Sequence, residues 1–286
     1  MMFCRNIKKC KIPKRLIFVK GEYKILECER CDFRYSEIDL PLEKHLQAVY
    51  SDDYFFGGKD GYPDYFEEEA NIIKEGEFYA NILGKYRTPG RMMDIGAAAG
   101  FVMQGFSNKG WEVFGIEPNK TMTDYGIREL NLKIINDSFE NFDFRGKYDL
   151  VTLIQVIGHF YDLNVAMEKL NDIVMPGGYI LVESWDMKSM YAKIMGKNWH
   201  EYSPPSVLNW FSRSSLTSCF EQYEFELIET GTPQKKISLN HALTLFEHKY
   251  PGLKFVSHII DTIKGEKDYN MIYPALDIFW SIFKKK

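Results

Sequence analysis

The sequence predicts an α/β protein built around a doubly wound parallel sheet. Segments with strand-like and helix-like spacing alternate along the chain, a turn of small residues joins one early strand to the next helix, and the following strand ends on an acid. Such alternation is typical of a parallel sheet with helices on both faces. In a sheet of this kind a ligand binds outside the carboxyl ends of the strands.

The first strand of this sheet, with its turn and helix, is the centre of the prediction. Residues 92–95 are an apolar strand, residues 96–100 read Gly-Ala-Ala-Ala-Gly, and residues 101–109 have helical spacing. Small residues let the backbone lie directly against a ligand, with the helix N-terminus behind it. The second strand, residues 111–116, ends on Glu117, and an acid in this place can hold a ribose diol. The segment therefore predicts a nucleoside-binding half-fold.

The remaining elements follow the same alternation. Apolar spacing predicts helices at 62–86, 120–130 and 167–173, and strands at 132–135, 147–155, 179–183, 225–230 and 277–283. The strand at 147–155 is a continuous apolar run, as expected for a parallel strand covered on both faces. Two inserts are expected, an aromatic segment at about 186–212 and a helical segment at about 237–265.

The small-residue turn carries a specific motif. It reads Asp94-x-Gly96-x-Ala98-x-Gly100, which resembles motif I of the class I S-adenosylmethionine (SAM) methyltransferases, usually Asp/Glu-x-Gly-x-Gly-x-Gly. Ala98 stands where the family has its middle glycine and adds one methyl group. A dinucleotide fingerprint fails, because its last small residue would fall on Phe101. The alternative is another α/β protein with a tight small-residue turn.

This resemblance implies a Rossmann-like, seven-stranded sheet whose last strand is antiparallel. It also implies a set of SAM-binding residues. The turn would cradle the methionine part of SAM, the acid and the residue after it would hold the ribose, the turn after the third strand would face adenine, and the end of the fourth strand would lie near the methionine. The corresponding residues here are Asp94, Gly96, Ala97, Ala98, Gly100, Glu117, Pro118, Asp137, Ser138 and Gln155. Asp137 could equally be a helix N-cap.

His159 is the candidate catalytic residue. Many small-molecule methyltransferases have a similar motif at this strand end, with Glu-His; here the Glu position is Gly158 and the histidine is kept. With an ordinary pKa of about 6.5, an imidazole can serve as a general base for an oxygen acceptor. The alternative is a histidine that packs under the cofactor. His200, in the aromatic insert, is a second and weaker candidate.

The N-terminal segment, residues 1–45, is rich in cysteine and in basic residues. Cys4, Cys10, Cys28 and Cys31 resemble a degenerate zinc ribbon, with a Cys-x-x-Cys pair but a longer first spacing. Reduced thiols without metal are the alternative. Residues 46–286 form the expected SAM-binding domain, and Tyr50 and its neighbours resemble a flap beside the pocket in ribbon-bearing methyltransferases.

The composition of the chain limits the classes of substrate and partner that are expected. The first 34 residues hold ten Lys/Arg against four Asp/Glu, whereas the whole chain has a net charge of −4. This mostly acidic body argues against duplex nucleic acid as the substrate. No apolar run reaches about 20 residues, and no signal peptide is evident, so a cytoplasmic protein is expected. The expected acceptor is a small molecule such as a sugar or a secondary-metabolite or envelope-polysaccharide precursor. A non-catalytic SAM-binding scaffold and an RNA-modifying enzyme are the alternatives, and the sequence does not fix the oligomeric state.

Overall fold

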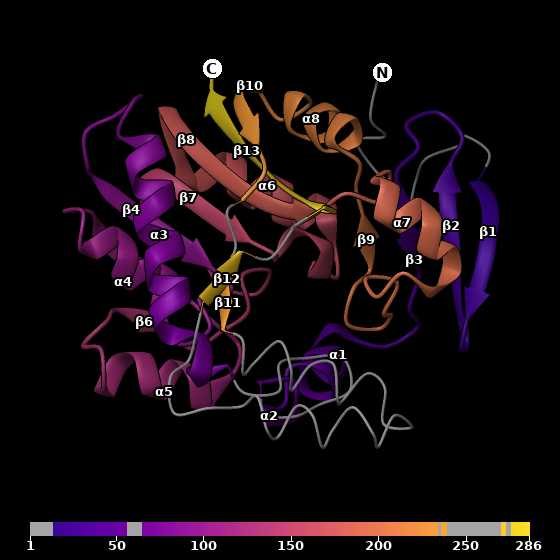
Figure 1. Cartoon of the computed structure of the whole chain (residues 1–286), viewed down its shortest axis with the longest axis horizontal. Helices are drawn as coiled ribbons and strands as arrows, with labels where there is room; N and C mark the ends of the chain where they lie inside the picture. Colours follow the sequence, from indigo (N-terminus) through magenta and orange to yellow (C-terminus); the bar gives the residue numbers. More distant parts are fainter. Residues whose placement is uncertain (1–13, 56–64, 234–235, 239–269, 273–275) are drawn as a thin grey trace.

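The central element is a mostly parallel sheet of seven strands. The computed structural model describes residues 14–55, 65–233, 236–238, 270–272 and 276–286 (Figure 1). The strands are β4 (Arg91–Ile95), β5 (Glu112–Ile116), β6 (Ile134–Ile135), β7 (Tyr148–Ile154), β8 (Val174–Trp185), β10 (Phe225–Gly231) and β13 (Ile278–Lys285). Their order is β10-β13-β8-β7-β4-β5-β6, and β13 pairs antiparallel with both neighbours. The predicted doubly wound sheet with an antiparallel last strand is confirmed.

Helices cover both faces of this sheet. Those of the sheet domain are α3 (Glu69–Leu83), α4 (Phe101–Ser107), α5 (Lys120–Arg128), α6 (Leu163–Ile173) and α8 (Arg213–Glu221). Successive strand residues point to opposite faces, so Met92 and Leu150 are buried with residues of α3 and α4. Their neighbours Met93 and Val151 are buried with residues of α6 and α8. The two cores explain why these strands are apolar without interruption.

Short helices complete the described chain. They are α1 (Leu42–Val49), α2 (Asp52–Phe55) and α7 (Met190–Met195), with the 3₁₀ turns η1 (Phe66–Glu68), η2 (Ile157–His159) and η3 (Gly196–Asn198). The helix expected at 62–86 begins at η1 and continues as α3; residues 56–64 lie outside the described part. Within the described residues, no helix is both long and apolar enough to cross a membrane.

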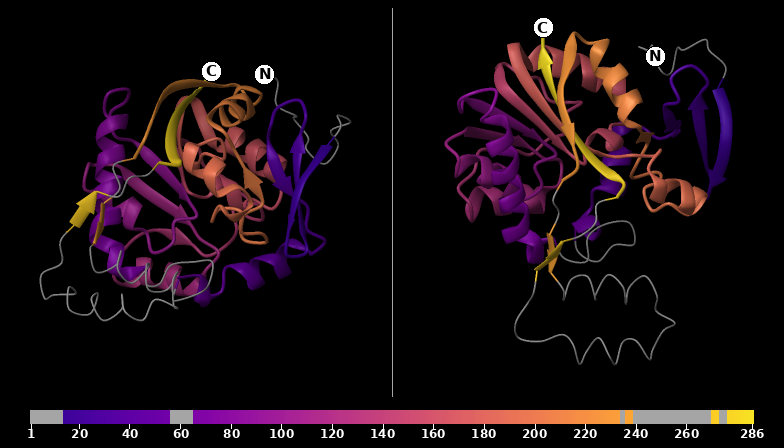
Figure 2. Two further views of the ribbon diagram at one scale, coloured as in Figure 1. Left: turned by 45° about the vertical axis from the view of Figure 1, so that its right-hand side comes forward. Right: turned by 45° about the horizontal axis from the view of Figure 1, so that its top comes forward.

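The N-terminal segment and the aromatic insert form one second sheet. It consists of β1 (Lys14–Lys20), β2 (Tyr23–Cys28), β3 (Arg34–Ser36) and β9 (Asn209–Trp210), in that order. β3 pairs antiparallel with β9, with Arg34 opposite Trp210 and Tyr35 opposite Asn209. Both views of Figure 2 show the indigo strands beside the orange insert. The segment is therefore joined to residues 186–212 by backbone hydrogen bonds.

Several predicted boundaries differ from the structure, and the differences are largest at α6, at β8 and in the helical insert. α6 starts at Leu163, four residues before the expected helix. β8 starts at Val174, five residues before the expected strand, because Val174 pairs with Tyr148 and the ladder then shifts register to Leu150 opposite Tyr179. Pro176, Gly177 and Gly178 thus lie within the strand, at this shift in register, instead of preceding it. The helix expected from residue 237 begins instead with β11 (Lys236–Ser238), which pairs with β12 (Asn270–Ile272). Residues 239–269, with the rest of that insert, lie outside the described residues.

Candidate functional site

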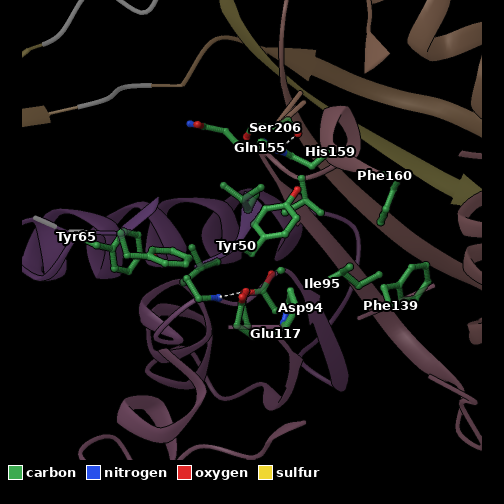
Figure 3. A pocket seen from close by; sticks show the side chains of 18 of the residues that line it. Tyr50, Tyr65, Asp94, Ile95, Glu117, Phe139, Gln155, His159, Phe160 and Ser206 are labelled. Carbon is green, nitrogen blue, oxygen red and sulfur yellow. Dashed lines mark hydrogen bonds between the residues drawn. The ribbon is translucent and has the colours of Figure 1, made fainter. Parts of the chain in front are cut away.

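A cavity of ≈ 580 Å³ lies outside the carboxyl ends of the parallel strands. That volume is within the range of small-molecule sites, about 300–1,000 Å³. Of the predicted cofactor and catalytic residues, the structure places Asp94, Gly96, Ala97, Ala98, Glu117, Pro118, Ser138, Gln155 and His159 in its lining. The site predicted from strand ends is therefore brought together in one cavity, in which the ring of Tyr50 lies between two groups of these residues (Figure 3).

The small-residue turn follows β4 directly and has an unusual backbone. Gly96 has φ +69°, and a Cβ there would lie 2.5 Å from Val156 Cγ2. Ala98 also has a positive φ, +46°, which is uncommon for a residue with a side chain. Gly100, with φ +85°, caps α4, and a Cβ there would lie 2.4 Å from Leu132 Cδ1. Gly100 shapes the turn without lining the cavity.

Two acids stand at the ends of neighbouring strands. Glu117 is 4% exposed, and its two carboxylate oxygens accept hydrogen bonds from the backbone N–H groups of Ala98 (2.9 Å) and Asn119 (2.8 Å). Asp94 accepts from the Thr152 hydroxyl at 2.5 Å. Burial raises the pKa of each carboxyl to about 7, although these hydrogen bonds act to lower it. A buried carboxylate held in this way can accept further hydrogen bonds from a ribose diol.

The turn after β6 contributes differently from the prediction. Asp137 does not line the cavity, and its carboxylate accepts from the backbone N–H of Ser138 at 2.7 Å. Ser138, Phe139 and Glu140 do line it. Glu140 accepts from the backbone N–H of Asp162, and burial raises its pKa to about 7. Sequence reasoning missed Glu140, although it closes the same acidic turn.

Gln155 directly follows β7 and has a strained backbone conformation. Its φ is +58°, in the left-handed region that costs energy for a non-glycine residue. Its side-chain amide donates to Glu183 at 2.8 Å, and Glu183 also accepts from the hydroxyl of Tyr79. These partners hold Gln155 beside the Gly96 turn, in the place expected for the methionine end of SAM.

His159 closes η2 on the far side of the cavity from the acids. Its Nδ1 lies 2.9 Å from the backbone carbonyl oxygen of Ser206. A carbonyl only accepts, so Nδ1 carries the proton and Nε2 carries the lone pair. Burial lowers the pKa of His159 to about 4, against the Ser206 hydrogen bond, and nearby His45 lowers it further. The imidazole is therefore neutral at physiological pH and has one basic nitrogen.

α1 and the residue that follows it, Tyr50, supply a wall of the cavity. His45 and Leu46 of α1 line it with Tyr50, whose ring centroid is 6.1 Å from that of His159. The side chain of Asn119 donates to the Tyr50 carbonyl and to the carboxylate of Asp52, and its backbone N–H donates to Glu117. Asn119 therefore connects this wall to Glu117. Sequence reasoning proposed a flap here but missed His45, because nothing in the local pattern says that α1 reaches the cavity.

The charge of the lining favours a cationic ligand. Among the described residues, six carboxyl side chains line the cavity against a single lysine, Lys74; they are Glu68, Glu75, Asp94, Glu117, Glu140 and Glu201. Burial raises the pKa of Asp94, Glu117 and Glu140 to about 7 and that of Glu201 to about 8, so these four are only partly ionised at neutral pH, and a cationic ligand favours their ionised form. SAM carries a sulfonium and an ammonium group against one carboxylate, so its net charge complements this lining. The narrow turn, the paired acids and the lining charge all fit SAM. His200, the second catalytic candidate, does not line the cavity and packs on Trp185, which does.

The three cysteines of the described residues do not line the cavity. Cys28 and Cys31 are buried at the β2–β3 turn and belong to the same apolar core as Cys219 of α8. In the described part of the chain, no group of three or more Cys, His, Asp or Glu side chains could hold a metal ion. Cys4 and Cys10 lie outside the described residues, so the four-cysteine zinc site stays a prediction.

Comparison with curated proteins finds O-methyltransferases among the relatives of this chain. Ubiquinone biosynthesis O-methyltransferases from Bradyrhizobium sp. (strain ORS 278) and Rhodopseudomonas palustris (strain BisB18) are 25% identical over 166 residues and 28% identical over 132 residues. The matches cover 55% and 44% of this chain, but only 59% and 49% of those relatives. The chain thus spans about half of the length of these curated relatives.

Solved structures share the fold at low identity. The magnesium protoporphyrin IX methyltransferase of Synechocystis PCC 6803, with S-adenosylhomocysteine (SAH) bound, has a TM-score of 0.54 at 11% identity, covering 84% of this chain and 100% of its own. The 1,6-didemethyltoxoflavin-N1-methyltransferase of Burkholderia thailandensis has 0.53 at 11%, covering 96% and 99%. A family model described as a methyltransferase domain matches residues 68–230, more than half of the chain. The chain therefore belongs to the methyltransferase-domain family of class I SAM-dependent enzymes.

Proposed function

We propose that this protein transfers the methyl group of SAM to a hydroxyl oxygen of a small-molecule acceptor. The observation that carries the proposal is His159, a neutral imidazole whose Nδ1 is fixed by the Ser206 carbonyl, in the same cavity as the acids of the SAM site. The names of the curated relatives, which are O-methyltransferases, support an oxygen acceptor.

One group of residues would bind SAM, and His159 would accept the proton of the acceptor. Glu117 would hold the ribose, the Gly96–Ala98 backbone would hold the methionine part, and Ser138 and Phe139 would lie along the adenine. When bound, SAM supplies an electrophilic methyl group, so the protein has no leaving group to activate. Holding the hydroxyl in line with that methyl can provide about 7–11 kcal/mol through proximity and orientation.

His159 would act on the acceptor itself. As the hydroxyl oxygen bonds to the methyl carbon and the carbon–sulfur bond breaks, the hydroxyl proton passes to Nε2, and the products are SAH and a methyl ether. Because burial keeps the pKa of His159 at about 4, the ring returns this proton readily to solvent. General base catalysis contributes about 10²–10⁴-fold and is most effective when the pKa of the base is near the operating pH, so the low pKa of His159 favours the lower end of this range.

Turnover tests the proposal. Purified protein with SAM carrying a labelled methyl group would be screened against hydroxylated small molecules, including sugars, with formation of SAH and transfer of the label to the acceptor as the readout. We expect label in a methyl ether that alkali does not hydrolyse. Binding of SAH without turnover of any acceptor would favour the scaffold alternative. Methylation of RNA that is lost as salt is added, without turnover of any small molecule, would favour the RNA-modifying enzyme.

Structural zinc is a separate proposal. It rests on Cys28 and Cys31, which share the β2–β3 turn, and on the two cysteines of the undescribed N-terminus. Elemental analysis of purified protein is expected to give about one zinc ion per chain, the stoichiometry of a four-thiolate site. Protein that is folded and contains no zinc would contradict this proposal and leave the methyltransferase proposal unaffected.

A further inference from the structure

Glu201 is an acid of the cavity that the proposed mechanism does not use. It belongs to the aromatic insert, and its side chain lines the cavity and is 14% exposed. In the part of the chain that the structure describes, no hydrogen bond reaches its carboxyl group, and its one ion-pair partner is His200, whose Nε2 lies 3.6 Å from Oε1. Enclosing a carboxyl group in this way lowers stability unless a ligand bonds to it.

The backbone around Glu201 is fixed on the acceptor side of the cavity. The carbonyl oxygen of Glu201 accepts a hydrogen bond from the indole N–H of Trp210 at 2.6 Å. Five residues further along the same loop is Ser206, whose carbonyl holds Nδ1 of His159. Figure 3 shows Ser206 and His159 together, on the far side of the cavity from Glu117. One loop therefore carries Glu201 and anchors the proposed base.

An aromatic ring lies close to this acid. Trp185 lines the cavity as Glu201 does. The ring of His200 packs on Trp185 edge to face, with 4.6 Å between the ring centroids, and its Nε2 is the atom that faces Glu201. His200 does not line the cavity, so it contacts both lining residues from outside. A carboxylate near an indole ring can bind an ammonium group through charge and through the face of the ring.

We propose that the acceptor carries a protonated amino group in addition to the reacting hydroxyl, and that Glu201 binds this amino group. The hydroxyl would meet His159, and the ammonium would lie against Glu201 and Trp185. This inference rests on the proposed function and names the class of substrate for the same site, a hydroxylated amine such as an amino alcohol or an amino sugar. Glu201 is here a specificity-determining residue, since it would bind the acceptor away from the reacting oxygen.

The electrostatics of this wall favours a cation. Burial, and to a smaller extent the nearby carboxyl of Asp277, raise the pKa of Glu201 to about 8. An ammonium beside the carboxyl lowers that pKa, so the bound cation and the ionised acid stabilise each other. An anionic group at the same place would be repelled by both acids. Lys74 also lines the cavity, from α3, but makes no ion pair with Glu201 in the described part of the chain.

Calorimetric titration of the full-length protein saturated with SAH tests the inference without a known substrate. The probes are two matched pairs, tyramine with tyrosol and glucosamine with glucose. In each pair an ammonium group of the first molecule is a hydroxyl group in the second, and the rest is the same. Because SAH occupies the acids of its own site, the comparison reports the remaining space. We expect at least one amine to bind ten-fold or more tightly than its partner, which corresponds to about 1.4 kcal/mol.

Variants assign this preference to Glu201. Glu201→Gln keeps the size of the side chain and removes its charge, so it should bind the amine no more tightly than the neutral partner. It should keep its SAH affinity within two-fold and melt no lower than wild type, because it removes a mostly buried acid. Glu68→Gln is the matched control, since Glu68 is another acid of the lining, in η1. It should keep the preference within two-fold.

The outcomes separate the inference from the proposed function. Wild-type protein that binds SAH but prefers neither amine overturns the inference alone. A Glu201→Gln variant that keeps the preference also overturns it, as does an equal loss in Glu68→Gln, which would show a general effect of negative charge. Labelled SAM that methylates the nitrogen of a preferred amine would overturn the oxygen acceptor and leave the binding role of Glu201 standing. Folded wild-type protein that does not bind SAH overturns the proposed function itself.

Discussion

Glu117 should make SAH binding depend on pH in a predictable direction. Burial raises the pKa of its carboxyl to about 7 in the free protein. The ionised form accepts hydrogen bonds from a ribose diol more strongly than the protonated form, so binding lowers this pKa and releases a proton. Affinity therefore falls as pH falls through 7. With one group of pKa 7, the ionised fraction drops from about 0.9 at pH 8 to about 0.1 at pH 6, so Kd should rise about ten-fold.

Glu117→Gln should weaken binding for a reason visible in the structure. One carboxylate oxygen accepts from Ala98 N–H and the other from Asn119 N–H. A glutamine NH₂ would meet an N–H donor in either orientation. An unsatisfied buried donor costs about 1–3 kcal/mol, and we expect at least a ten-fold loss of affinity and a much flatter pH profile. Any remaining slope would report Asp94 or Glu140, since burial raises the pKa of both carboxyls to about 7 and both line the cavity.

The assay is calorimetric titration with SAH at pH 6, 7 and 8, in buffers of different ionisation enthalpy that reveal the released proton. Glu112→Gln is the matched control, because Glu112 is exposed at the opposite end of β5 and should behave as wild type. Wild-type affinity that is constant from pH 6 to 8 would refute the linkage. Equal affinities of the two variants would refute the assignment of the ribose to Glu117.

Three further substitutions test other parts of the site. His159→Phe should leave SAH affinity within two-fold while kcat for an identified acceptor falls by about 10²–10⁴; an unchanged kcat would assign His159 to packing. Asn119→Ala removes the cap of α5 and the bond to the Tyr50 carbonyl. Loss of a cap costs about 0.5–2 kcal/mol, so the melting temperature should fall by about 2–4 °C for each kcal/mol. An unchanged melting temperature would show that Asn119 does not stabilise the protein through these hydrogen bonds. Thr152→Val leaves Asp94 without its hydroxyl partner; urea unfolding should show a loss of about 1–3 kcal/mol, and no loss would show that the bond is not formed in solution.

The sheet could be predicted because its signals are local. Each parallel strand is buried on both faces and so reads as an apolar run, and the Gly96–Gly100 turn needs small residues for its positive φ angles. The end of each strand could be located, and the carboxyl ends of parallel strands share one edge. That geometry is why Glu117, Gln155 and His159 could be placed together before the structure was known.

What could not be predicted depends on contacts between distant segments. The pairing of β3 with β9 joins residues about 175 positions apart, and no periodicity marks it. His45 looks like an ordinary helix residue until α1 is placed over the cavity. Asp137 and Glu140 are both acids in one turn, and only the backbone path decides that Glu140 lines the cavity while Asp137 bonds to Ser138.

A crystal structure of the protein with SAH bound tests the central claim most directly. The account predicts the ribose hydroxyls on the carboxylate of Glu117, the methionine part along the Gly96–Ala98 backbone, and the sulfur facing the side of the cavity where His159 bonds to Ser206. SAH bound elsewhere, or bound in this cavity with its ribose away from Glu117, would contradict it.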